Sequence, residues 1–116
     1  MWHGEFVQKL SGETVSFHLK TMLKTRCRSV MGGASYSNDE GYSVELVLYN
    51  GEFDGTILKV EYKNKKSYVF QKGIIFAEMN AKGDKLQGFF VGLSPSENTI
   101  IHGSVFLSND YDLRSQ

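Results

Sequence analysis

A short phrase of the form apolar–x–Gly–x–aromatic recurs along this chain and constrains its fold more than any other feature. It occurs at residues 2–6, 49–53 and 86–90, and a looser version follows at residues 101–106. Each phrase lies in or beside an alternating apolar run, where a glycine lets a strand bend or lets a neighbouring backbone come close. Bends repeated in this way favour a curled antiparallel sheet.

Apolar and polar residues alternate through most of the chain, which is typical of strands with one buried face. In the second such run Val15, Phe17 and Leu19 alternate with polar residues, and His18 faces the other way. The pattern predicts about eight strands, at residues 2–10, 14–23, 27–36, 42–49, 56–63, 67–79, 85–93 and 99–108, the sixth bent or broken at Gly73. Residues 20–29 also have an apolar spacing that would suit a short helix.

The segments between these runs are short and rich in turn-forming residues. Residues 11–12, 50–51, 64–65 and 82–84 have the Gly, Asn and Asp content of hairpin turns. Short connections favour an up-and-down meander, and closing it into a barrel removes exposed sheet edges. The chain is therefore predicted to be one all-β antiparallel barrel over residues 1–108 with a polar tail over residues 109–116. A two-sheet sandwich is the alternative.

Two resemblances bear on this choice. Trp2 and Gly4, followed by antiparallel strands with glycine–aromatic phrases, resemble the small calycin-type barrels, the lipocalin-like and avidin-like proteins. The lipocalin order of glycine and tryptophan is reversed here, so no ligand residues are carried over. Residues 30–35 are similar to the Val-Met-Gly-Gly-x-Ser phrase of the complex I assembly-factor family, whose domain is a jelly roll, and this keeps the sandwich open.

Composition limits the partners and the compartment. Lys+Arg and Asp+Glu both number 13, so the formal net charge is zero, and electrostatics gives no reason to expect nucleic acid or an anionic membrane as a partner. Cys27 is the only cysteine, which excludes an intrachain disulfide. No apolar run approaches the roughly 20 residues of a membrane span, and the N-terminus lacks a signal-peptide pattern. We expect a cytoplasmic protein.

Candidate chemistry is sparse. A zinc site needs three or four converging ligands, whereas His3, His18 and His102 fall on outward positions of different strands. Neither a nucleophile elbow nor a phosphate-binding loop is present. Neighbours in a strand point to opposite faces, so Arg26 and Arg28 would face away from Cys27. We expect no metal and no cofactor, and an enzyme that acts through Glu78 or a histidine is the least favoured of the functions considered.

Aromatic residues offer a small-ligand site. Trp2, Tyr62 and Tyr68 could line a pocket at one mouth of the barrel, and Tyr62 and Tyr68 fall on an inward register. Glu78 joins this set if it shares an inward face with Ile74 and Phe76, but residues 75, 77 and 79 make an equally apolar face, so its register stays open. Large inward side chains are expected to fill an eight-stranded interior and leave little room for a ligand.

Strands four to seven are apolar on both faces, unlike the second strand. Alternation assigns eight of their apolar residues to the outside: Val47, Tyr49, Ile57, Val69, Ile75, Met79, Phe89 and Val91. The predicted interface consists of these residues other than Ile75 and Met79. An exposed apolar patch of this kind indicates a protein contact, and a twofold homo-oligomer is the simplest case. The sequence therefore predicts a non-enzymatic interaction or assembly module, with a calycin-like small-ligand binder as the alternative.

Overall fold

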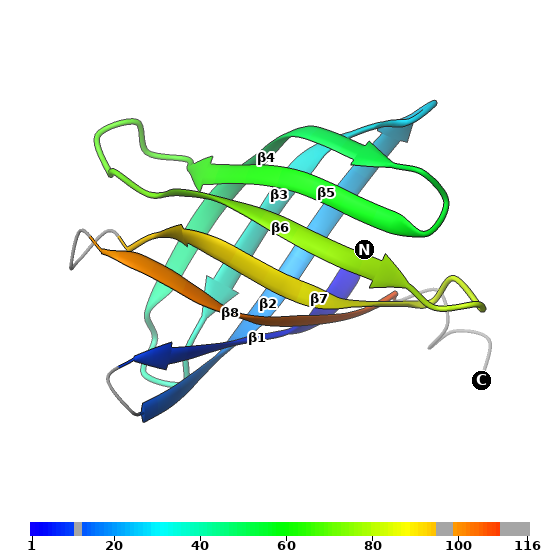
Figure 1. Ribbon diagram of the computed structural model, residues 1–116. Coiled ribbons are helices and arrows are strands. Elements are labelled where there is room, and N and C mark those ends of the chain that lie inside the picture. Colours follow the sequence, from blue (N-terminus) through cyan, green and yellow to red (C-terminus); the bar gives the residue numbers. More distant parts are fainter. Residues whose placement is uncertain (11–12, 95–98, 110–116) are drawn as a thin grey trace.

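The structure is a computed structural model in which residues 1–10, 13–94 and 99–109 are described (Figure 1). The strands are β1 (Trp2–Leu10), β2 (Glu13–Arg26), β3 (Ser29–Ser37), β4 (Ser43–Phe53), β5 (Ile57–Asn64), β6 (Lys72–Met79), β7 (Lys85–Leu93) and β8 (Ile100–Asn109). Each strand pairs with the next in antiparallel register, and β1 pairs with β8 to close a barrel. The predicted all-β barrel is confirmed, and the sandwich is not adopted.

The alternation in the sequence places the strands well. The bounds of β1 and β7 agree with those predicted, and Leu46 is buried while Glu45 is exposed, as the β4 register requires. Residues 20–26 continue β2, and no helix occurs in the described residues. The same residues contain no helix able to span a membrane. The predicted turn at residues 11–12 and the tail from residue 110 onward lie outside the described residues.

The predicted starts of two strands, β3 and β6, are wrong. The sixth strand begins at Lys72 and not at residue 67. Residues 65–71 form a connection in which the Asn64 Oδ1 accepts a hydrogen bond from the Lys66 N–H at 2.8 Å. At the other boundary β3 begins at Ser29, so Cys27 is an exposed turn residue with a φ of 56° and not the first residue of a strand.

The predicted turn at residues 50–51 is a bulge inside β4. Asn50 has a φ of 50°, and the β4–β5 register shifts between Tyr49 and Glu52. The chain turns instead at residues 54–56, where the Asp54 carboxylate accepts hydrogen bonds from the Thr56 and Ile57 N–H groups at 2.9 and 2.7 Å. These two bonds hold the pKa of Asp54 below its usual value. An Asx turn of this kind fixes the position of a hairpin. It does not alter the alternation of apolar and polar residues, so that alternation does not predict it.

The recurring glycine phrases mark close approaches between strands. A Cβ at Gly4 would lie 1.7 Å from the Phe106 carbonyl oxygen, and one at Gly88 would lie 1.8 Å from that of Phe76. Neither position can carry a side chain without moving the neighbouring strand. These contacts let the sheet coil tightly enough to close.

The two halves of the barrel interior differ. The half that contains the start of β1 and the β4–β5 turn is a packed core, with Trp2, Val30, Leu58, Val60, Leu86 and Leu107 among its buried residues. The other half lies toward the end of β7 and the β3–β4 and β5–β6 connections, which border the mouth. Its inward side chains leave a cavity.

Candidate ligand-binding cavity

A cavity of about 390 Å³ opens at the mouth of the barrel. This volume lies within the range of small-molecule sites, roughly 300–1,000 Å³. The cavity is mainly apolar and is lined by Phe6, Gln8, Phe17, Leu19, Tyr36, Asn38, Tyr42, Leu46, Tyr62, Gln71, Ile75, Phe90, Ser94, Ile101 and Val105. Every strand contributes at least one of these residues, so closure of the barrel assembles the site.

The expectation that large side chains fill the interior is wrong. Phe6 and Phe17 stack against each other on one wall, with ring centroids 4.8 Å apart. Tyr36 and Phe90 meet Phe6 edge-on at 4.9 and 5.3 Å. Phe6 therefore contacts aromatic rings from β2, β3 and β7, and the cavity remains beside this cluster. Geometries of this type are the favourable ones for aromatic pairs.

A chain of amide and hydroxyl groups ties the β5–β6 connection to β3 beside the cavity. The Asn64 side chain donates to the Gln71 Oε1, and the Gln71 Nε2 donates to the Tyr36 hydroxyl, both at 2.9 Å. Burial raises the pKa of Tyr36, and the hydrogen bond from Gln71 offsets part of this effect. Tyr36 therefore stays an uncharged hydroxyl at the cavity wall.

Tyr62 reaches across to β6 and β7, into a niche that two glycines leave open. A Cβ at Gly73 or Gly92 would lie 2.3 or 2.1 Å from the Tyr62 hydroxyl oxygen. The residue is 5% exposed. Burial raises the pKa of Tyr62, and the nearby Tyr36 adds to this rise. A larger residue at either glycine would occupy the space that the Tyr62 ring now fills.

Two polar groups in the cavity have no hydrogen-bond partner in the part of the chain that the structure describes. Gln8 is 7% exposed and lines the cavity from β1. Among the described residues, no group forms a hydrogen bond with the Gln8 amide or the Tyr62 hydroxyl, and every fully buried polar side-chain atom there is paired. The polar atoms of Gln8 and Tyr62 are therefore open to the cavity space. Because these polar atoms face the cavity space, a hydroxyl or amide of a bound molecule can form hydrogen bonds with them.

The structure brings one of the four predicted ligand residues to this cavity, namely Tyr62. Trp2 is buried in the packed core at the opposite end of the barrel. Tyr68 is 82% exposed, so its predicted inward orientation is wrong. It lies before β6, where the strand register does not apply. The sequence did not determine the orientation of Glu78. In β6, Ala77 points inward and Glu78 is exposed on the outer face.

Sequence reasoning missed Gln8 and Gln71. Gln8 points inward on β1, as Trp2 and Phe6 do. A glutamine at a position where the alternation predicts an apolar residue could have identified it as a cavity residue. Gln71 is buried only because the β5–β6 connection folds back against β3, which the sequence pattern does not reveal.

The six predicted interface residues do not form one surface, and the assignment of Ile75 and Met79 to the outside is wrong, because both pack against the core. Val47 and Tyr49 line a shallow groove over β2–β4 beside the exposed Met22 and Met31, and the Lys63 Nζ lies 5.0 Å from the centre of the Tyr49 ring. Val69 lies in the β5–β6 connection. The remaining three, Ile57, Phe89 and Val91, are exposed on the outer face of β5 and β7.

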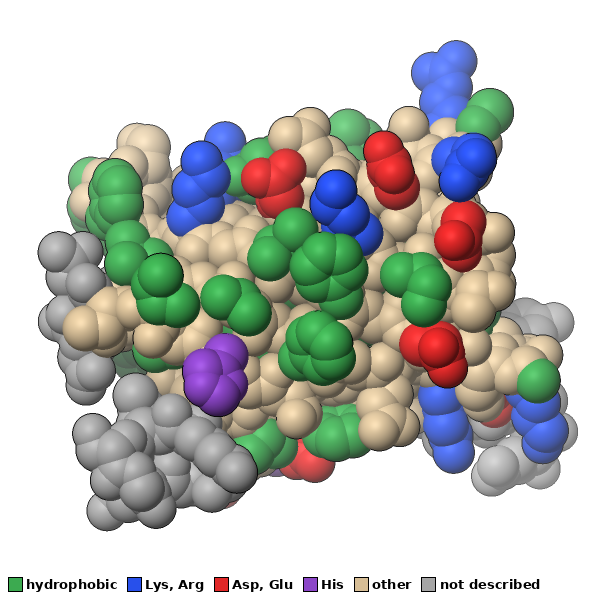
Figure 2. Space-filling view, viewed as in Figure 1, with side chains coloured by type: hydrophobic (Ala, Val, Ile, Leu, Met, Phe, Trp, Pro, Cys, Tyr) green, Lys and Arg blue, Asp and Glu red, His purple; other side chains and the backbone are tan. Residues whose placement is uncertain are grey.

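Exposed apolar side chains gather on the face formed by β6 and β7, with charged side chains beside them (Figure 2). Phe76 and Phe89 are cross-strand partners, as are Ile74 and Val91. Phe89 is 60% exposed. Residues directly opposite each other in a sheet lie about 5 Å apart, so these four side chains form a contiguous patch, hereafter the β6–β7 patch.

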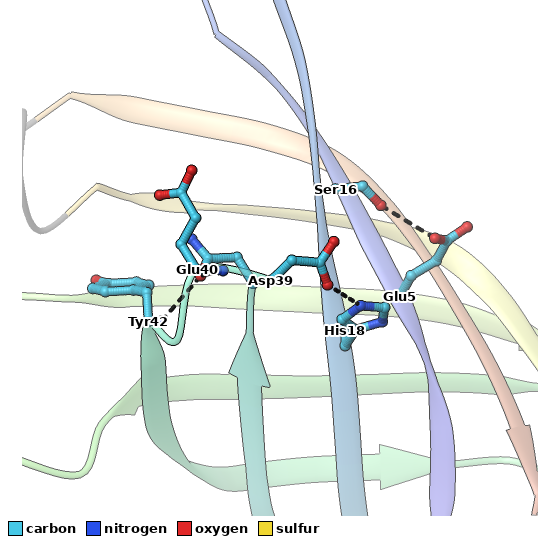
Figure 3. A network of polar contacts seen from close by, with 7 residues as sticks. Glu5, Ser16, His18, Asp39, Glu40 and Tyr42 are labelled. Carbon is cyan, nitrogen blue, oxygen red and sulfur yellow. Dashed lines mark hydrogen bonds and ion pairs between the residues drawn. The ribbon is translucent and has the colours of Figure 1, made fainter.

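A polar cluster on the outside of β1 and β2 contains a serine, a histidine and carboxylates (Figure 3). The Ser16 hydroxyl donates to Glu5, and the His18 Nε2 lies 3.1 Å from the Asp39 Oδ1. Because the serine bonds to Glu5 and not to His18, the cluster does not form a nucleophile–base pair. It joins the β3–β4 connection to β2.

No group of three or more His, Cys, Asp or Glu side chains that could hold a metal ion occurs in the part of the chain described. His18 and His102 are exposed on different strands, as their sequence positions predicted. In comparisons with known proteins, no family model, curated protein or solved structure matched this chain.

Proposed function

We propose that this protein binds a small, largely apolar molecule in the mouth of its barrel without chemical conversion. The observation that carries the proposal is a mainly apolar cavity of about 390 Å³ in which the Gln8 amide and the Tyr62 hydroxyl have no hydrogen-bond partner among the described residues. Apolar walls supply affinity, while a few placed polar groups orient the ligand. The resemblance of the chain to calycin-type barrels supports the same function.

A cavity-filling substitution tests this proposal. Ile101 lines the cavity, whereas its neighbour Ile100 is exposed on the outer face. The neutral fluorescent probe N-phenyl-1-naphthylamine should bind the wild type and Ile100→Trp alike. Ile101→Trp should weaken binding at least about tenfold, because one added indole occupies the space the probe needs. Circular dichroism checks that both variants fold. Equal binding by all three proteins, or no binding by the wild type, would refute the proposal.

A second candidate function is self-association through the β6–β7 patch. The exposed Phe76–Phe89 pair favours it, because contiguous apolar patches on monomers are uncommon. Lys59 and Glu61 lie beside the patch, opposite Phe76 and Ile74 in the β5–β6 register. A twofold axis that crosses β5 between Lys59 and Glu61 would pair the lysine of one copy with the glutamate of the other. We therefore assign a second copy of this chain as the occupant.

Light scattering at micromolar concentration tests the self-association. The wild type should have the mass of a dimer, and Phe89→Lys with Val91→Lys should be a folded monomer. Val47→Lys, on the separate β2–β4 surface, should remain dimeric. A monomeric wild type would contradict self-association through the β6–β7 patch and would leave the cavity proposal unaffected.

A further inference from the structure

We infer that the ligand of this cavity is an uncharged, mainly apolar molecule that carries a hydroxyl or amide group, an inference that rests on the proposed binding function. Among the described residues, the side chains that line the cavity include no Lys, Arg, Asp, Glu or His. Charged residues on the same strands, such as Glu5, Lys20 and Glu78, are exposed instead. The described lining of the cavity thus offers no counter-charge.

The absence of charge in this lining discriminates between ligand classes. An ion that enters a low-dielectric cavity loses its hydration, and only a paired charge or many hydrogen bonds can compensate for that loss. Tyr36 and Tyr62 are held neutral by burial and supply neutral donors and acceptors. A carboxylate or ammonium ligand therefore binds far more weakly than a neutral molecule of the same shape.

The unpartnered groups define the polar part of the ligand. The Gln8 amide offers two N–H donors and one carbonyl acceptor, and a tyrosine hydroxyl can donate or accept. A hydroxyl or amide on the ligand can satisfy either group, whereas a pure hydrocarbon leaves both unpaired at a cost in affinity. The Phe6, Phe17 and Phe90 rings favour a planar ring as the apolar part, through edge-to-face contact.

Three naphthalene derivatives of the same ring size separate these features: 2-naphthalenemethanol, 2-naphthoate and 2-methylnaphthalene. In titrations of the wild type at pH 8, the neutral alcohol should bind at least about 100-fold more tightly than the carboxylate. It should bind about 2- to 10-fold more tightly than the methyl compound. Gln8→Leu should remove most of the preference for alcohol over methyl, while Gln87→Leu, on the outer face, should preserve it.

The outcomes distinguish this inference from the proposed function. If the carboxylate binds as tightly as the alcohol, the inference is overturned and the cavity remains a binding site. Equal affinity for the alcohol and the methyl compound overturns the hydrogen-bonding part. If none of the three ligands binds, the proposed function fails and the inference fails with it. The wild-type comparison decides these points even if Gln8→Leu does not fold.

Discussion

At the residue scale, the chemistry of the cavity depends on Tyr62 and on the two glycines that accommodate it. Its hydroxyl fits against β6 and β7 only because Gly73 and Gly92 lack side chains there. Tyr62 is 5% exposed and no group among the described residues hydrogen-bonds its hydroxyl, so burial favours the neutral phenol. The same residue that prepares the cavity for a neutral ligand therefore makes folding sensitive to alkaline pH.

Tyr62 should make the protein lose stability above pH 10. Its pKa is raised in the folded state, so its contribution is fully present below the unfolded value near 10 and is lost as pH rises toward the folded value. The loss is at most about 1.4 kcal/mol per pH unit for this group. Urea unfolding at several pH values should show a shallower decline above pH 10 for Tyr62→Phe. Tyr68→Phe, at an exposed tyrosine, should follow the wild type; identical slopes for all three would contradict the assignment.

At the scale of single elements, periodicity located the strands but not their irregularities. Alternation in the sequence was sufficient for β1 and β7, whose bounds it predicted, and for the inward face of β4 around Leu46. It failed where a side chain binds nearby backbone, as Asn64 and Asp54 do. The bulge at Asn50 was mistaken for a turn because Asn–Gly suits both.

Neighbouring residues of β4 should respond very differently to truncation. Leu48 is 2% exposed in the core, while Val47 is half-buried on the outer face. Leu48→Ala should lower the free energy of unfolding by about 2–5 kcal/mol, the usual cost of a core cavity. Val47→Ala should cost less than about 1 kcal/mol. Chemical denaturation measures both, and comparable losses would show that the β4 register is wrong.

At the scale of the whole molecule, the sequence predicted a closed barrel but not a hollow one. Closure followed from short connections and the need to pair both edge strands. The cavity did not follow, because side-chain volume alone does not reveal that Phe6 and Phe17 stack on one wall while Gly73 and Gly92 add little volume to another. Gln8 and Tyr62 become candidate ligand contacts only because the cavity leaves space beside them.

The most direct measurement of ligand binding in the cavity is a set of intermolecular NOEs between 2-naphthalenemethanol and the methyl groups of the protein. Ile75, Ile101 and Val105 line the cavity, whereas Ile74 and Val91 belong to the outer β6–β7 patch. The account predicts NOEs from the naphthalene protons to the first three residues and none to the other two. NOEs confined to Ile74 and Val91 would place the ligand on the outside of the barrel and contradict the central claim.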